Sequence, residues 1–212
     1  MNIIKKLSNE MHASKTIKPS FKLVHLLLSL VIFQQETQGI GRYRLENELC
    51  LSEGKVRSLL KHMKQKHLIE VDNKLNVHVL TEKGYSTLID ITKILTPPKE
   101  PNFEITQIVI GDFVRYSIVH NGRSRLKTGL EQRDEAIKIG GSGATCLIMK
   151  NGEFFFPPTP TMQNTSIPVA IDPNNLNYPF SESDVLVLGT GKSQYLANLA
   201  AIAAALSLAH HV

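Results

Sequence analysis

Residues 41–80 read GRYRLENELCLSEGKVRSLLKHMKQKHLIEVDNKLNVHVL, and the rest of the chain is expected to be organised around this stretch. Two leucines four positions apart predict a short helix over residues 42–49. Ser52 is a favourable N-cap and Glu53 a favourable first-turn residue for a second helix, which extends to about Lys66. The stretch therefore predicts two helices separated by a tight turn.

The second helix has two contrasting faces. Its apolar residues follow the i, i+3, i+4, i+7 spacing of a buried stripe, and they are Val56, Leu59, Leu60 and Met63. The opposite face carries Ser58, Lys61 and Gln65, flanked by Arg57 and Lys64. Side chains of these types contact phosphates and purine edges in protein–DNA complexes.

A hairpin is predicted to follow this helix. Residues 68–71 form an apolar strand, residues 72–74 a turn, and residues 75–80 an alternating second strand. Thr81 then caps a further helix. Helix, turn, helix and hairpin in this order are typical of a winged helix-turn-helix. We therefore predict that the stretch binds DNA mainly through residues 55–66.

The same residues resemble a known family. The segments SEGKVRSLLKHMKQKHLIEV (residues 52–71) and LTEKG (residues 80–84) resemble bacterial and archaeal winged-helix regulators, which carry a V-R-x-L-L recognition helix and a Leu-Thr-x-x-Gly helix entry. His67 stands where those regulators usually have a glycine. The whole chain is similar to archaeal proteins of unknown function that join a winged helix to an α/β domain. The resemblance implies an architecture and a regulatory role, and it brings no active site with it.

The net positive charge of the chain comes from its first half. Residues 1–100 hold 16 Lys and Arg against 10 Asp and Glu, a net charge of +6, whereas residues 101–212 hold 8 against 9, a net charge of −1. A polyanion is therefore the expected partner of the first half. With 212 residues, of which 42% are hydrophobic, the chain is long enough for two small domains.

Cysteine usage and hydropathy predict a cytoplasmic protein without a membrane partner. Cys50 and Cys146 lack the C-x-x-C spacing of a zinc site or a disulfide framework. The apolar run over residues 23–33 is too short to span a bilayer, so a buried helix is expected over residues 21–35. Residues 1–19 are predicted to form either a mobile arm or one loosely docked helix. The lysines of this segment that are placed to touch phosphate are Lys5, Lys6, Lys15 and Lys18.

A proline-rich linker over residues 97–102 is predicted to separate a first domain, residues 1–96, from a second, residues 103–212. Its prolines are expected to stop the preceding helix and to prevent pairing into a sheet. The expected fold class is α+β: an N-terminal winged helix-turn-helix plus a C-terminal mixed α/β domain with a central sheet and a long apolar C-terminal helix.

The second domain shows two hairpin signals. Residues 103–110 and 113–120 are predicted to pair around Gly111-Asp112, and residues 146–149 and 153–156 around Asn151-Gly152. A helix is predicted over residues 130–139, and a long ordered loop over residues 157–179. The final helix, residues 194–209, is apolar on nearly every face, so it is either buried under the sheet or the seam of a homodimer.

Two glycine-rich segments, residues 140–144 and 189–193, suggest a ligand site. The second segment is not a P-loop because Leu186 stands where the first glycine of that motif is required, so no nucleotide hydrolysis is predicted. Backbone N–H groups at a helix start suit an anion, but the glycines equally suit a close strand-to-helix turn. The predicted ligand-binding residues are Gly141, Ser142, Gly143, Thr190, Gly191, Lys192 and Ser193.

No catalytic residues, metal site or cofactor are predicted. His62, His67 and His78 are not spaced to place three metal ligands on one helical face. In the second half, Ser142 lacks the G-x-S-x-G frame of a hydrolase, and His120, His210 and His211 have no evident nucleophile to activate.

We therefore predict a dimeric regulator that binds double-stranded DNA and whose second domain binds a small anionic effector or a second subunit. The predicted DNA-binding residues are Arg42, Arg44, Lys55, Arg57, Ser58, Lys61, Lys64, Gln65 and Lys74. Two alternatives stay open, because a winged helix does not by itself fix function. One is an enzyme of nucleotide or cofactor metabolism with a winged-helix appendage, and the other is a protein–protein scaffold.

Overall fold

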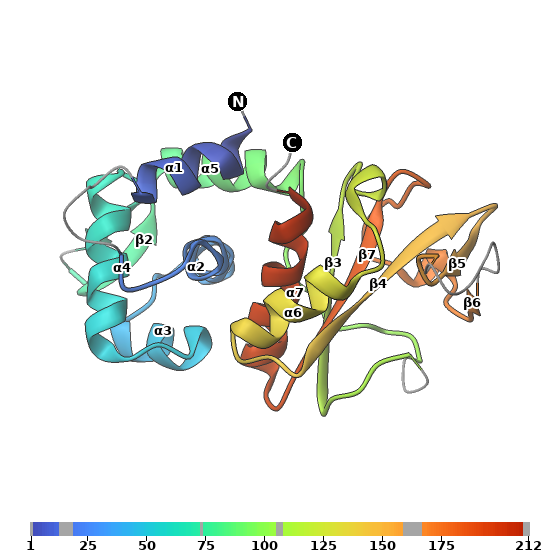
Figure 1. Ribbon diagram of the computed structural model, residues 1–212. Coiled ribbons are helices and arrows are strands. Elements are labelled where there is room, and N and C mark those ends of the chain that lie inside the picture. Colours follow the sequence, from blue (N-terminus) through green and yellow to red (C-terminus); the bar gives the residue numbers. More distant parts are fainter. Residues whose placement is uncertain (1, 13–18, 73, 105–107, 159–166, 210–212) are drawn as a thin grey trace. The chain divides into compact units, whose positions relative to one another are not determined.

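The computed structural model describes residues 2–12, 19–72, 74–104, 108–158 and 167–209 (Figure 1). These residues form seven α-helices and two β-sheets, which confirms the predicted α+β class and its long C-terminal helix. The chain divides into two compact units, Met1–Thr92 and Lys93–His211. The first unit thus ends a few residues before the predicted linker.

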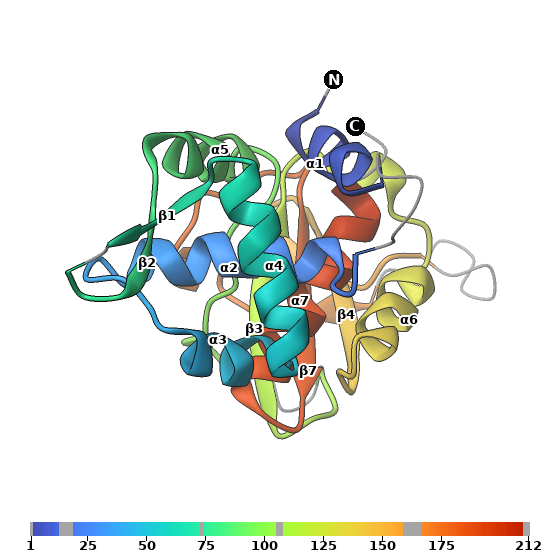
Figure 2. The ribbon, with the colours of Figure 1, turned by 90° about the vertical axis from the view of Figure 1, so that its left-hand side faces the viewer.

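The N-terminal unit surrounds one apolar helix with four others and a small sheet (Figure 2). Its helices are α1 (Ile3–His12), α2 (Leu23–Gln35), α3 (Arg42–Leu49), α4 (Glu53–Gln65) and α5 (Glu82–Thr92). The helices predicted over residues 21–35 and 42–49, and the one predicted to end near Lys66, are confirmed as α2, α3 and α4. Residues 23–33 are all buried, and α2 contacts α1, α3, α5 and the sheet, so α2 is the centre of this core.

Residues 3–12 form the packed helix α1, so the alternative of a mobile arm is wrong for them. Ile4, Leu7 and Met11 are buried at the i, i+3, i+7 spacing of one helical face. The lysines between them obscured this short stripe in the sequence. Lys15 and Lys18 lie outside the described residues.

The small sheet pairs β1 (Ile69–Asp72) with β2 (Val77–Leu80) in antiparallel register, as predicted for the hairpin. The second strand starts later than expected, since residues 74–76 belong to the turn and Leu75 is 62% exposed. Ile40 adds a single-residue bridge on the other side of β2 through two backbone hydrogen bonds with His78. The sheet therefore joins the start of α3 to the hairpin.

The end of α4 and the start of α5 are fixed by three residues around the hairpin. His67 adopts the left-handed conformation, φ 57°, which a glycine in this position would adopt without strain. The Thr81 hydroxyl donates to the His67 carbonyl at 2.6 Å and accepts from the Gly84 N–H at 3.0 Å, so it caps α5 as predicted. A Cβ on Gly84 would lie 2.1 Å from the Leu68 carbonyl oxygen, so only glycine lets α5 approach β1 this closely.

The C-terminal unit is an antiparallel five-stranded sheet with strand order β3-β7-β4-β5-β6. The strands are β3 (Phe113–Val119), β4 (Gly143–Lys150), β5 (Glu153–Phe155), β6 (Pro168–Val169) and β7 (Val185–Gly191). Helices α6 (Leu130–Lys138) and α7 (Gln194–Ala209) pack against β3, β4 and β7 (Figure 1). The helices predicted over residues 130–139 and 194–209 and the hairpin around Asn151-Gly152 are confirmed. Strand β6 lies within the segment 157–179, which was predicted to be a long loop. Residues 159–166 of that segment lie outside the described residues.

Two predictions about residues 97–110 are wrong. The described residues 103–104 and 108–110 form no strand, and β3 pairs with β7 instead of with them. Residues 95–99 do pair with β3, although Pro97 and Pro98, which were expected to prevent pairing, lie among them. Pro97 and Pro98 lack N–H groups, but the pairing uses the N–H groups of Thr96 and Lys99, which lie on either side of them.

Helix α7 approaches the sheet closely because two glycines of β7 face it. A Cβ on Gly189 would lie 2.1 Å from the Ala201 nitrogen, and one on Gly191 would lie 2.7 Å from the Ala197 nitrogen. Strand β7 continues through both glycines. Helix α7 therefore packs on its own sheet, as one of the two predicted arrangements requires.

Candidate nucleic-acid interface

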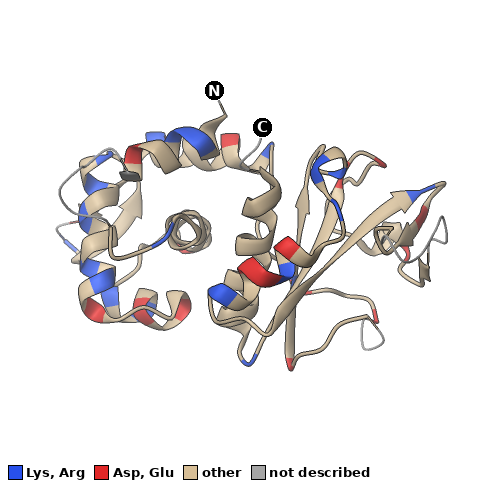
Figure 3. Ribbon diagram, viewed as in Figure 1, with Lys and Arg blue, Asp and Glu red and all other residues tan. Residues whose placement is uncertain are grey.

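Helix α4 presents the predicted cationic face to solvent. Val56, Leu59, Leu60 and Met63 are buried, which fixes the rotation of the helix. On the other faces Ser58 and His62 are half-buried, and the exposed side chains include those of Lys55, Arg57, Lys61, Lys64 and Gln65. Lys and Arg residues therefore recur along the accessible sides of α4 (Figure 3).

The arginines of this surface are tied to glutamates of the same unit. Arg44 donates to Glu48 at 2.6 Å and also to Glu36, and these hydrogen bonds raise the pKa of its guanidinium above the ordinary value. Arg57 pairs with Glu53 one turn earlier in α4. The same carboxylate lies 3.8 Å from Arg42. A phosphate would have to compete with these carboxylates for each arginine, so the arginines are weaker phosphate ligands than the sequence suggested.

The lysines of α4 differ from the arginines in lacking a carboxylate partner among the described residues. Lys55, Lys61 and Lys64 form no ion pair with any residue in the described part of the chain. Lys66, at the end of the helix, is paired with Glu10 at 2.9 Å, and a hydrogen bond from Lys66 lowers the pKa of that carboxyl. Lys74 is exposed on the hairpin turn, where its N–H donates to Asp72 at 2.8 Å. Four cations of the predicted set are thus available to an anion.

Two histidines of the unit, His62 and His78, are partly buried. His62 stacks edge-on against Phe21, with ring centroids 5.6 Å apart, and burial lowers its pKa. Burial and the nearby Lys64 also lower the pKa of His78. Across residues 2–12, 19–72, 74–104, 108–158 and 167–209, no three His, Cys, Asp or Glu side chains gather in a way that would hold a metal ion.

The two glycine-rich segments do lie together, but their polar groups bond to each other. The Ser142 N–H donates to the Thr190 carbonyl at 2.8 Å, and the buried Thr190 hydroxyl donates to the Gly143 carbonyl at 3.2 Å. The Ser193 hydroxyl accepts from the Leu196 N–H at 3.2 Å and so caps α7. Of the predicted ligand-binding residues, Ser142 and Lys192 are exposed. Close packing explains the remaining residues without a ligand.

Two features of the site had little or no sequence signal. The pairing of Arg44 with Glu48 follows the i, i+4 rule and was readable, whereas its pairing with Glu36 depends on how the turn before α3 folds. The bridge from Ile40 to His78 joins residues that no local pattern connects.

Among the described residues, no helix is both long and apolar enough to cross a membrane.

Fold and site together define an α+β protein of two compact units, with a cationic helix face in the first. Residues 110–208, which begin just before β3 and end in the last turn of α7, match a family described as a domain of unknown function (DUF4443). The chain is also similar to the solved structure of a hypothetical protein, PH0730, from Pyrococcus horikoshii OT3, with a TM-score of 0.67 and 22% identity, covering 89% of this chain and 93% of that one. No curated protein matches the chain. These findings show a shared fold and fit the resemblance to archaeal proteins of unknown function.

Proposed function

We propose that the protein is a cytoplasmic, DNA-binding transcriptional regulator whose N-terminal unit is a winged helix-turn-helix. The observation that carries this proposal is the exposed face of α4, where Lys55, Lys61 and Lys64 have no acidic partner among the described residues. Cations that are already free can neutralise phosphates without first breaking an ion pair, so they release the counterions that drive DNA binding.

The arrangement around α4 supports the same proposal. Helices α3 and α4 contact each other across a short turn, and the β1–β2 hairpin follows α4 directly. In a winged helix-turn-helix the second of these helices enters the major groove and the hairpin lies against the flanking backbone. In this chain α4 would present Arg57, Ser58, Lys61 and Gln65 to base edges. The phosphate contacts would come from Arg42, Arg44, Lys55, Lys64 and Lys74, with the two arginines weakened by their glutamates.

The role proposed for the second unit is control of this DNA contact, through a bound effector or a second subunit. Its net charge is close to zero, in contrast to that of the first half, so a polyanion is not its expected partner. Homodimer formation would place two copies of α4 on one duplex and would favour an operator with two symmetric half-sites.

Selection of bound fragments from genomic DNA at physiological salt tests the class of function. Enrichment of a common sequence, arranged as an inverted repeat, is the expected result, and the spacing of its halves would report the symmetry of the dimer. Failure to retain any DNA would reject the proposal and would favour the alternative of an enzyme with a winged-helix appendage.

Lys61→Glu tests the placement of the interface. It replaces a free cation at the centre of the exposed face by an anion, so affinity for the enriched fragment should fall at least about tenfold, and the slope of log K against log salt should become shallower by about one. The measurement is fluorescence anisotropy over a salt titration. Lys150→Glu is the matched control, because it makes the same charge change on an exposed lysine at the end of β4. Equal losses in the two variants would contradict the placement of DNA on α4.

A further inference from the structure

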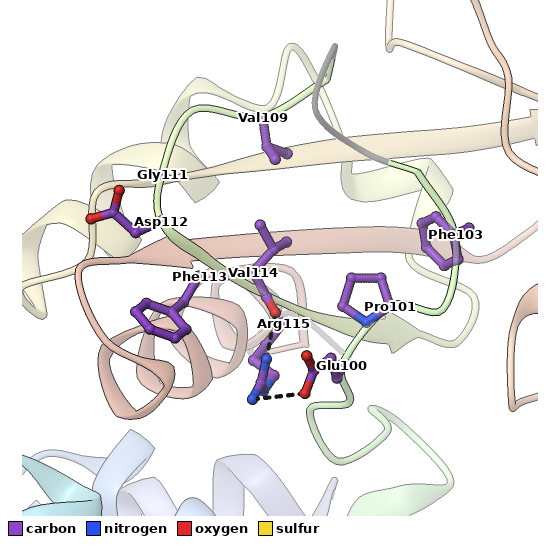
Figure 4. A pocket seen from close by; sticks show the side chains of 9 residues that line it. All are labelled: Glu100, Pro101, Phe103, Val109, Gly111, Asp112, Phe113, Val114 and Arg115. Carbon is purple, nitrogen blue, oxygen red and sulfur yellow. Dashed lines mark hydrogen bonds and ion pairs between the residues drawn. The ribbon is translucent and has the colours of Figure 1, made fainter.

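Strand β3 is covered along only half of its outer edge. Lys99 and Tyr116 exchange two backbone hydrogen bonds of 2.9 and 2.8 Å, and the Thr96 N–H donates to the Ile118 carbonyl at 2.9 Å. Beyond Lys99 the chain turns away from the strand at Pro101 (Figure 4). On this edge the first residues of β3, 113–115, have no neighbouring strand in the described part of the chain.

The uncovered edge presents a free hydrogen-bond donor. Along an antiparallel strand the backbone N–H and C=O groups of alternate residues point to the same edge. Because those of Tyr116 point outward to Lys99, those of Val114 also point outward. The Val114 carbonyl accepts from Arg115 Nη1 at 2.9 Å, whereas the Val114 N–H has no partner among the described residues. A strand edge of this kind is a template for another strand.

A groove of about 520 Å³ lies along this edge (Figure 4). Its apolar lining consists of Pro101, Phe103, Val109, Phe113 and Val114. Phe113 is 43% exposed, so part of its ring is available to a bound side chain.

The charges at the groove favour a cationic partner. Arg115 is held by Glu100 at 3.2 Å and its side chain is only 13% exposed, so its charge is already compensated. Asp112 is exposed at the rim and has no cationic partner within the described residues. The unbalanced charge of the groove is therefore negative.

We propose that this groove binds an extended peptide segment of a partner protein, which adds to β3 as a short strand. A peptide carbonyl would accept from the Val114 N–H, an apolar side chain would pack between Phe103 and Phe113, and a Lys or Arg would reach Asp112. Main-chain hydrogen bonds supply affinity in this type of recognition, and the pockets for alternate side chains supply specificity. The site lies within the second unit and does not depend on DNA binding by the first.

The test uses the full-length protein and a phage-displayed library of random heptapeptides. Enrichment of sequences that alternate apolar residues and contain Lys or Arg is expected, and an enriched peptide is then synthesised for titration. Val114→Pro removes the outward N–H without breaking a described hydrogen bond of that group, and proline is compatible with an edge strand. It should weaken binding about tenfold or more, as expected for loss of a central main-chain hydrogen bond. Val114→Thr keeps the N–H and the branched shape and should bind as the wild type does.

Two further measurements keep the proposal testable if Val114→Pro does not fold. An ester in place of the peptide bond whose carbonyl faces Val114 should weaken binding to the wild-type protein, because an ester carbonyl is a weaker hydrogen-bond acceptor than an amide carbonyl. Asp112→Asn should remove the preference for Lys or Arg. A library that yields no binding peptide, or a folded Val114→Pro that binds as well as Val114→Thr, would overturn the proposal. A third outcome would also overturn it. If no peptide is enriched, and if the protein forms concentration-dependent dimers that Val114→Pro abolishes, the occupant of the groove is a second copy of the chain.

Discussion

At the scale of single residues, His25 shows how a buried side chain can make folding depend on pH. It lies in the first turn of α2 and is 6% exposed, and its Nδ1 accepts a hydrogen bond from the Lys22 backbone N–H at 2.9 Å. A protonated Nδ1 cannot accept this bond. Burial, together with nearby Lys22 and Lys55, lowers the pKa of His25 to about 4.

The free energy of unfolding should therefore fall as the pH falls from about 6.5 to about 4. In this window the unfolded chain binds a proton at His25 and the folded chain does not, so acid favours unfolding, by about 3 kcal/mol in total. The measurement is urea denaturation at several pH values for the wild type and for His25→Asn, whose side-chain oxygen can still accept from Lys22 but does not titrate. Parallel stability curves for the two proteins would contradict the role assigned to His25.

Individual cations of α4 also differ in a way that their residue types do not reveal. Arg44 and Arg57 are tied to glutamates, whereas Lys61 is free of acidic partners in the described residues. The strongest candidate for a DNA contact is for this reason a lysine, although arginine forms the better bidentate contact with guanine in general.

At the scale of elements, the junction between α5 and the hairpin depends on one glycine. Gly84→Ala should destabilise the protein by about 1–3 kcal/mol, because the new methyl group would meet the Leu68 carbonyl oxygen at 2.1 Å and force the helix away from β1. Chemical denaturation gives the difference in the free energy of unfolding.

Gly54→Ala is the matched control, since Gly54 is also in a helix but a Cβ there would have nothing within 4 Å. It should stabilise the protein by about 0.5–1 kcal/mol, because alanine loses less backbone entropy in a helix than glycine does. Similar effects from the two substitutions would show that helix propensity alone governs both positions, and would refute the close approach of α5.

At the scale of the whole molecule, the two proposed binding surfaces belong to different compact units. In hydrogen–deuterium exchange, DNA should slow exchange of amides in Glu53–Gln65 and Val77–Leu80 and leave those of Phe113–Val119 unchanged. An enriched heptapeptide should do the reverse, with the largest effect near Val114. If DNA protected β3 and left α4 unprotected, the proposed placement of DNA on the first unit would be wrong.

Patterns along the chain determined most of the elements. Helices α2, α3, α4, α6 and α7 and the hairpins β1–β2 and β4–β5 follow from apolar spacing, caps and Asn-Gly or Asp-Asn turn signals, because those preferences act between residues close in sequence. The same spacing identified the exposed face of α4, since the buried stripe of an amphipathic helix fixes which side chains face outward.

The tertiary structure decided the contacts between distant residues. Residues 103–110 were expected to pair with the strand over residues 113–120, whereas β3 pairs with β7, more than sixty positions further on. Gly189 and Gly191 were expected in an anion site or a strand-to-helix turn, whereas they are strand residues of β7 that make room for α7. Neither the free cations of α4 nor the open half of the β3 edge has a local signature. A cation or a strand edge stays free only if no other part of the folded chain pairs with it. Strand order, close packing and ion pairing all depend on which residues become neighbours in three dimensions.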